Sequence, residues 1–189
     1  MIDQRDRAEI ERLTEEYGGQ WGINHTRRLL QLIAIIGEGH EYDADVVWLA
    51  AHLHDWGAYG PWPKAGVDHA VRSKQVAEPF LREQDFPPEL IELVLECIEQ
   101  HHQGGANRRI ESILLSDADA LDFLGAVGVL RDFSKKPNDL RAAYKMVRTR
   151  MEKLPKMICL AKTKEIAAKR LQEMESLLAA FEAETFGCF

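Results

Sequence analysis

The spacing of apolar residues is the feature that most constrains how this chain can fold. Along nearly its whole length, apolar side chains recur every three or four residues, which places them on one face of an α-helix. No stretch shows the alternation of polar and apolar residues, with a period of two, that is typical of a half-buried strand. The sequence therefore predicts an all-α protein of about seven or eight helices, with no internal repeat.

The first 55 residues contain three predicted helices. Residues 5–16 predict a short helix, and residues 24–37 predict a central helix that is apolar on more than one face. Asn24 is a candidate N-cap of this central helix, which would place His25 in its first turn. A third buried helix is expected over residues 43–55, with aspartates near its start.

Loops rich in proline or glycine separate the remaining helices. The segment 61–66, PWPKAG, must be a loop, because proline does not fit a helix interior. Gly125 and Gly128 are candidate bends in a later segment. The helices predicted after this loop lie at residues 68–84, 85–102, 110–130, 138–154 and 161–184.

Length and composition indicate a single domain. At 189 residues the chain can bury most of its apolar surface without disulfides. Its 46% of hydrophobic and 29% of charged residues are typical of a soluble globular protein. We expect one all-α domain over residues 1–189. The C-terminal helices at 137–186 either pack on the rest or mediate association, so that monomer and homodimer both stay open.

Charge and cysteine spacing exclude several classes of protein. The formal net charge of −7 disfavours binding to nucleic acid polymers or to an anionic membrane, since both need a basic face. No apolar run approaches the roughly 20 residues that span a bilayer, and the charged start MIDQRDRAEIERL is not a secretory signal. Cys97, Cys159 and Cys188 are widely spaced, so no disulfide framework is expected, and Cys97 is predicted to be a buried small apolar residue. A cytoplasmic protein is therefore expected.

Histidines gather at the predicted helix boundaries. Six of the seven lie there, joined by two acids. They are His25, His52, His54, His69, His101 and His102, with Asp55 beside His54 and Asp119 in LLSDADALDFLGA. A single histidine at a helix end is more often a cap or a surface residue, but the joint pattern is hard to obtain by chance. Imidazole nitrogens and carboxylate oxygens together suit a divalent transition metal.

Helical geometry ranks some of these candidates. His54 and Asp55 diverge by roughly 100° on a helix, so both reach one ion only at a helix end, which the following DWG supplies. His52 and His54 lie roughly 200° apart, and His54 is the preferred ligand. The adjacent His101 and His102 cannot be ranked by spacing.

These residues, in this order, resemble the HD-domain metal-dependent phosphohydrolases, and the DADALDFLGAVG stretch looks like their small bacterial single-domain branch. The family signature is a histidine on one helix, a His-Asp doublet at the end of a later helix, and a distant aspartate. The resemblance covers roughly residues 20–131 and is carried by His25 in NHTRR, His54 and Asp55 in AAHLHD, and Asp119 in SDADALDFLGAVGVLR. It implies a compact multi-helix bundle with these four residues as metal ligands at helix ends. Asp117 is an alternative to Asp119, and Asp122 is expected to orient a ligand.

Some branches of the family hold a second metal with two further histidines. His69 and His101 lie at the matching places, with His102 as an alternative to His101. With a single metal, they would instead donate hydrogen bonds to the substrate phosphate. The resemblance implies one or two ions of Fe, Mn, Co, Ni or Zn that activate a water molecule, and Asp55, His69 and His101 as catalytic residues.

A phosphate ester also needs positive charge around it. The candidates are Arg27 or Arg28 (with Arg28 preferred), Lys64, Arg72 or Lys74, and Arg108 and Arg109. Trp56, Tyr59 and Trp62 either stack on a nucleobase or pack the loop over the helix ends.

The resulting functional hypothesis is hydrolysis of a phosphate ester, in a nucleotide or another small phosphorylated metabolite. Two alternatives stay open. One is a di-iron oxygenase on the same scaffold, and the other is a non-catalytic regulator that binds a nucleotide.

Overall fold

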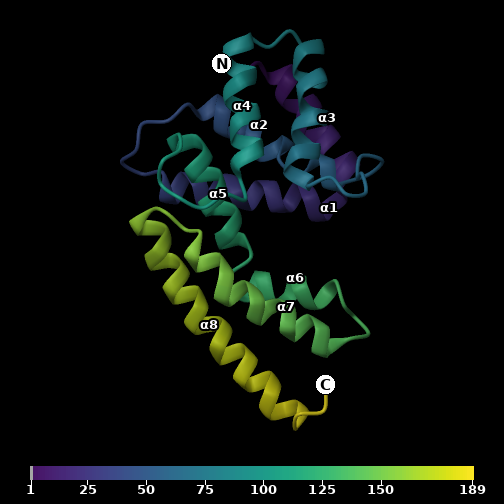
Figure 1. Cartoon of the computed structure of the whole chain (residues 1–189), viewed down its shortest axis with the longest axis vertical. Helices are drawn as coiled ribbons and strands as arrows, with labels where there is room; N and C mark the ends of the chain where they lie inside the picture. Colours follow the sequence, from purple (N-terminus) through teal and green to yellow (C-terminus); the bar gives the residue numbers. More distant parts are fainter. Residues whose placement is uncertain (1) are drawn as a thin grey trace. The chain divides into compact units, whose positions relative to one another are not determined.

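The computed structural model describes residues 2–189 and confirms the all-α prediction (Figure 1). These residues form eight α-helices and two short 3-10 helices, with no strand. The α-helices are α1 (Gln4–Ile36), α2 (Ala44–Leu53), α3 (His69–Glu83), α4 (Pro88–Gln100), α5 (Ile110–Asp122), α6 (Ala126–Ser134), α7 (Leu140–Lys153) and α8 (Ala161–Thr185). The 3-10 helices are η1 (Trp56–Ala58) and η2 (Leu154–Lys156).

The chain divides into two compact units, Met1–Ser116 and Asp117–Phe189. The first contains α1 to α4 with η1, and the second contains α6 to α8 with η2. The boundary falls inside α5. The prediction of one domain over residues 1–189 stays a prediction.

Gly19 interrupts the first helix. Its φ of 59° and ψ of −164° are not helical, and glycine reaches this region at low cost because it has no Cβ. Two helical segments therefore flank it, as the sequence predicted. The predicted N-cap at Asn24 was wrong, because the second segment begins earlier and Asn24 lies inside it. His25 is consequently in the second turn of this segment.

Aspartates start the two helices on either side of the loop. Asp43 accepts hydrogen bonds from the backbone N–H groups of Asp45 and Val46 at the start of α2. Asp68 accepts from Ala70 N at 2.9 Å, and also from Val71 N, at the start of α3. Such caps stabilise a helix by about 1 kcal/mol each. Asp43 fixes where α2 begins, and Asp68 fixes where the loop between α2 and α3 ends.

The 3-10 turn η1, at the start of the loop between α2 and α3, packs closely against α1 and α3. Gly57 N donates to Ser73 Oγ at 2.9 Å, and a Cβ on Gly57 would lie only 2.3 Å from the backbone nitrogen of Ser73. Trp56 is buried, and its Nε1 donates to Thr14 Oγ1 at 3.1 Å. Its ring packs edge-on against Tyr17, with ring centroids 5.1 Å apart. These contacts fix the chain directly after the His-Asp doublet.

The second unit is built from amphipathic helices, as predicted. α6 packs against both α7 and α8 (Figure 1). Arg148 of α7 forms ion pairs with Glu175 at 2.6 Å and Glu182 at 3.1 Å on α8. Asp132 of α6 is buried and pairs with Arg150 of α7 at 2.6 Å. Ion pairs and apolar packing thus hold the three helices together.

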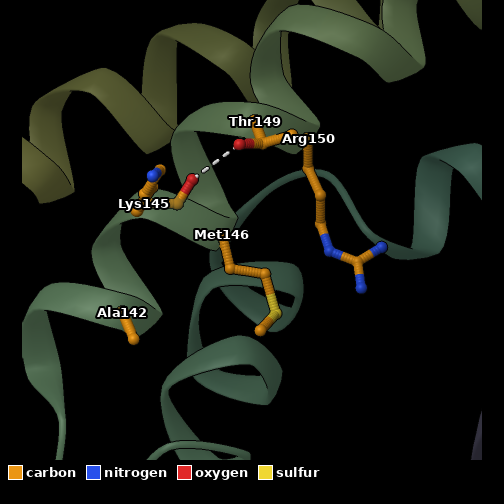
Figure 2. A pocket seen from close by; sticks show the side chains of 5 residues that line it. All are labelled: Ala142, Lys145, Met146, Thr149 and Arg150. Carbon is orange, nitrogen blue, oxygen red and sulfur yellow. Dashed lines mark hydrogen bonds between the residues drawn. The ribbon is translucent and has the colours of Figure 1, made fainter.

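Figure 2 shows a pocket on one face of α7. Within it, the Thr149 hydroxyl donates to the backbone oxygen of Lys145 at 2.9 Å. The lining residues are Ala142, Lys145, Met146, Thr149 and Arg150. None of them is a predicted metal ligand.

The cysteines are free thiols in different environments. Cys97 is fully buried, and the Ser112 hydroxyl donates to its sulfur at 3.4 Å. Burial disfavours the thiolate and raises the pKa of Cys97 to about 12. The prediction that Cys97 is a buried apolar residue is confirmed. Cys188 is exposed.

No helix within residues 2–189 combines the length and apolar character that crossing a membrane requires.

Replacing Gly57 with alanine should destabilise the protein. The new methyl group would overlap the backbone of α3, and over-packing of this kind costs up to about 3 kcal/mol. The free energy of unfolding, measured in denaturant, should fall by about this amount. Ala58→Ser is the matched control, since Ala58 is exposed in the same turn and should change stability by less than about 0.5 kcal/mol. Equal stability of the two variants would contradict the close approach.

Thiol labelling should distinguish the cysteines. At pH 8 a thiol reagent should modify Cys188 within minutes and leave Cys97 unmodified, because Cys97 is buried and has a raised pKa. Mass spectrometry of the digested protein gives the extent of labelling at each site. In denaturant both should react. Equal labelling rates in the native protein would show that Cys97 is not shielded.

Candidate metal centre

Three of the predicted ligands meet where α2 ends. His25 comes from α1, His54 is the C-cap of α2, and Asp55 follows it. Asp55 Oδ2 lies 3.6 Å from His54 Nε2 and 3.9 Å from His25 Nε2. Bonds of roughly 2.0–2.2 Å to one ion place donor atoms about 3–4 Å apart, so this spacing fits a metal. Both imidazoles are buried, while the Asp55 side chain is 20% exposed.

The backbone fixes the orientation of the His54 ring. His54 Nδ1 lies 2.9 Å from the carbonyl oxygen of Ala51. A carbonyl only accepts, so Nδ1 carries the proton and Nε2 presents its lone pair. Within residues 2–189, this buried Nε2 has no hydrogen-bond partner. A histidine that binds a metal is commonly held in this way.

Three further histidines form a second group beside the first. His69 begins α3, His101 is the C-cap of α4, and His102 follows it. One nitrogen from each lies within 4.8 Å of the others. The Nδ1 of His101 is held by the carbonyl oxygen of Ile98 at 2.6 Å, and His69 Nε2 contacts His102 Nε2. Both adjacent histidines are therefore in this group.

Asp55 faces both groups. Its Oδ2 is turned toward His25 and His54, and its Oδ1 lies 3.8 Å from His69 Nε2. A carboxylate with its two oxygens turned toward two sets of imidazoles can share two cations. The geometry thus accommodates one or two divalent metal ions.

His52 belongs to neither group in the described part of the chain. Its Nδ1 donates to the carbonyl oxygen of Trp48 at 2.8 Å, and the two ring centroids lie 3.9 Å apart with their planes tilted by 36°. Burial lowers the pKa of His52 to about 4, so the ring is neutral at pH 7. The preference for His54 over His52 as the ligand stays a prediction.

The aspartates of the second unit have separate partners. Asp117 accepts hydrogen bonds from the backbone N–H groups of Cys159 and Leu160, both at 2.9 Å, and so holds the start of α8. Asp122 forms a buried ion pair with Arg131. Asp119 is also buried, and its role as the fourth ligand stays a prediction.

Several predicted phosphate contacts have structural partners. Arg72 Nε donates to the backbone oxygen of Trp62 at 2.7 Å, which ties the loop to α3. Arg108 donates to the backbone oxygens of Gln100 and Gly105 and thereby folds the loop after the second histidine group. The other candidates are exposed Arg27 and Lys64, half-buried Arg28, Lys74 paired with Glu99, and Arg109 paired with Glu96. Their roles toward phosphate stay predictions.

One contact of the site was missed from the sequence. Tyr59 was expected to stack on a nucleobase or to pack the loop, yet its hydroxyl donates to Asp55 Oδ2 at 2.9 Å. The contact crosses the 3-10 turn η1, in which Ala58 N donates to the carbonyl oxygen of Asp55 at 2.8 Å. The sequence predicted the end of a helix here, and beyond a helix end residue spacing alone does not decide which side chains meet.

Comparison with known proteins shows the family and the fold. The family model described as HD domain matches residues 22–124, more than half of the chain. No curated protein matches the sequence. Among solved structures, Bacillus subtilis YpgQ is 23% identical with a TM-score of 0.74, and the match covers 97% of each chain. An HD-superfamily hydrolase from Bacillus thuringiensis is 21% identical with a TM-score of 0.72, covering 96% of this chain and 97% of that one.

A third solved structure, a predicted HD-superfamily hydrolase from an uncultured Thermotogales bacterium, is 23% identical with a TM-score of 0.67, and the match covers 96% of this chain and 92% of that one. These likenesses show that the fold is shared. The segment that the family model matches starts before His25, ends after Asp119 and includes the His54-Asp55 doublet. On that evidence the chain belongs to the HD-domain family.

Proposed function

We propose that this protein is a metal-dependent phosphohydrolase that acts on a nucleotide or another small phosphorylated metabolite. The observation that carries the proposal is the Asp55 carboxylate, which lies between two groups of imidazoles at helix ends. Membership of the HD-domain family supports it, since HD domains bind divalent metals.

The two groups would have different roles. His25, His54 and Asp55 would hold the first ion, and Asp119 stays the predicted fourth ligand. His69 and His101 or His102 would hold a second. A divalent ion bound there supplies Lewis acidity, which acidifies a water molecule and polarises a phosphoryl oxygen.

The exposure of the side chains indicates from which side a substrate would reach the centre. The His25 side chain is 0% exposed and the His69 side chain is 37% exposed. The substrate phosphate would therefore approach from the side of His69, and with a single metal an imidazole N–H there can donate to it. Asp55 would take the proton of the attacking water, because it is the carboxylate that faces both groups.

A nucleotide is the substrate class that we favour. One similar solved structure, that of Bacillus subtilis YpgQ, is a complex with ADP, at 24% identity and a TM-score of 0.71. The chain carries a net charge of −7, so an anionic substrate needs local positive charge. Arg28, Lys64 and Arg72 are the proposed sources of that charge.

The group of three histidines beside Asp55 also favours a second candidate, a di-iron oxygenase, because such an enzyme needs ligands for two ions. Oxygen uptake by the iron-loaded protein, without release of phosphate, would support it. Tight binding of a nucleotide without turnover would instead indicate a regulatory module.

Asp55→Asn should abolish hydrolysis and weaken metal binding. Loss of a general base lowers the rate by about 100-fold or more, and loss of the carboxylate charge weakens the ion site. Release of phosphate or nucleoside from a panel of nucleotides measures the first effect, and elemental analysis measures the second. His40→Ala is the control, since His40 is exposed and lies in neither group of the described chain. Wild-type protein loaded with metal that hydrolyses no phosphate ester would contradict the proposal.

The variant His69→Ala should show whether the protein binds one metal ion or two. We expect the variant to keep the ion of the His25 group and to lose the second, so that about one metal equivalent per chain is removed. His25→Ala should weaken the first site instead. Calorimetric titration of each metal-free variant with Mn²⁺ gives the number of ions bound. Identical stoichiometry in wild type and His69→Ala would argue for a mononuclear centre.

A further inference from the structure

The Tyr59 hydroxyl lies in the candidate metal centre without being a metal ligand in the proposal above. It donates a hydrogen bond of 2.9 Å to Asp55 Oδ2, the oxygen that faces His25 and His54. Asp55 is therefore bound by a group from its own loop. An aspartate carboxylate rotates readily about its last side-chain bond. A single directed donor is enough to fix which oxygen faces which group.

The ring of Tyr59 packs against two glycines of α1, where the Cβ of any other residue would come too close to it. A Cβ on Gly18 would lie 2.8 Å from Tyr59 Cδ2, and a Cβ on Gly22 would lie 3.1 Å from Tyr59 Cε2. The ring therefore lies directly on α1, the helix that also carries His25. Close packing on a helix leaves the hydroxyl little freedom to move away from Asp55.

The backbone on both sides of Tyr59 is also held. Ala58 N donates to the carbonyl oxygen of Asp55 at 2.8 Å, and Trp62 N donates to the carbonyl oxygen of Tyr59 at 3.2 Å. The Trp62 carbonyl accepts from Arg72 of α3 at 2.7 Å. Hydrogen bonds therefore hold the segment 55–62 at Asp55, at Tyr59 and at Trp62.

We propose that Tyr59 is a positioning residue, whose hydroxyl orients the Asp55 carboxylate with Oδ2 toward His25 and His54 and with Oδ1 toward His69. The inference rests on the proposed metal centre. It adds that the affinity of this centre for a cation depends on a hydroxyl outside the ligand set. Loss of such a supporting hydrogen bond lowers metal affinity by about 10- to 100-fold.

The test is a titration of metal-free Tyr59→Phe with Co²⁺. The variant keeps the aromatic ring packed against Gly18 and Gly22 and removes only the hydroxyl that donates to Asp55. We expect its affinity for Co²⁺ to be about 10- to 100-fold below that of wild type. The visible absorption of bound Co²⁺ should also change, because the carboxylate is no longer fixed in its plane. Thermal unfolding without metal should match that of wild type, which separates positioning from a loss of structure.

Two further variants sharpen the comparison. Tyr17→Phe removes a hydroxyl from a nearby tyrosine of the same unit, which packs edge-on against Trp56 and Trp62 of the loop. It should bind Co²⁺ as wild type does. Gly22→Ala keeps the Tyr59 hydroxyl but pushes on its ring, and it should weaken Co²⁺ binding in the same direction as Tyr59→Phe.

Wild-type affinity and spectrum in Tyr59→Phe, or an equal loss in Tyr17→Phe, would overturn the positioning role. Wild-type protein that binds no Co²⁺ would overturn it together with the metal centre. The proposed hydrolase activity is tested separately, by phosphate release. If Co²⁺ binding weakens as expected but wild type hydrolyses no phosphate ester, the positioning role stands and the hydrolase proposal fails. If wild type hydrolyses the ester and Tyr59→Phe binds Co²⁺ as wild type does, the hydrolase proposal stands and the positioning role fails.

Discussion

The position of one carboxylate, that of Asp55, governs the organisation of the candidate metal centre. Its two oxygens face two sets of imidazoles, and its side chain is only 20% exposed. A partly buried charge of this kind is costly unless cations or hydrogen-bond donors surround it. The helix ends supply those groups, since side chains leave a helix end in directions that its interior does not allow.

The loop after Asp55 is as important as the helices. Gly57 lets the chain approach α3 more closely than any Cβ would permit, and the Trp62 carbonyl accepts a hydrogen bond from Arg72. Tyr59 returns to Asp55 from the same loop. A segment rich in glycine, proline and aromatic residues is therefore an ordered part of the site. Its glycines allow close packing at these points, rather than motion.

Much of the fold could be predicted because the information is local. Periodicity located the helices, and short polar residues such as Asp43 and Asp68 marked their starts. The error at Asn24 has a local cause as well. The break lies at Gly19, where a left-handed backbone ends one helical segment, and a good capping residue a few positions later is then simply a helical residue.

The sequence by itself determined that the chain is helical and that a His-Asp doublet stands at a helix end, but not every helix boundary, since the helix predicted over 110–130 is divided into α5 and α6. Only the tertiary structure decided which remote residues share a group. In the tertiary structure His25 lies beside the doublet, His101 and His102 both lie beside His69, and the Tyr59 hydroxyl donates to Asp55. The physical reason is that helix periodicity depends on neighbours within a few residues along the chain. Distances between donor atoms on different helices depend on how those helices pack.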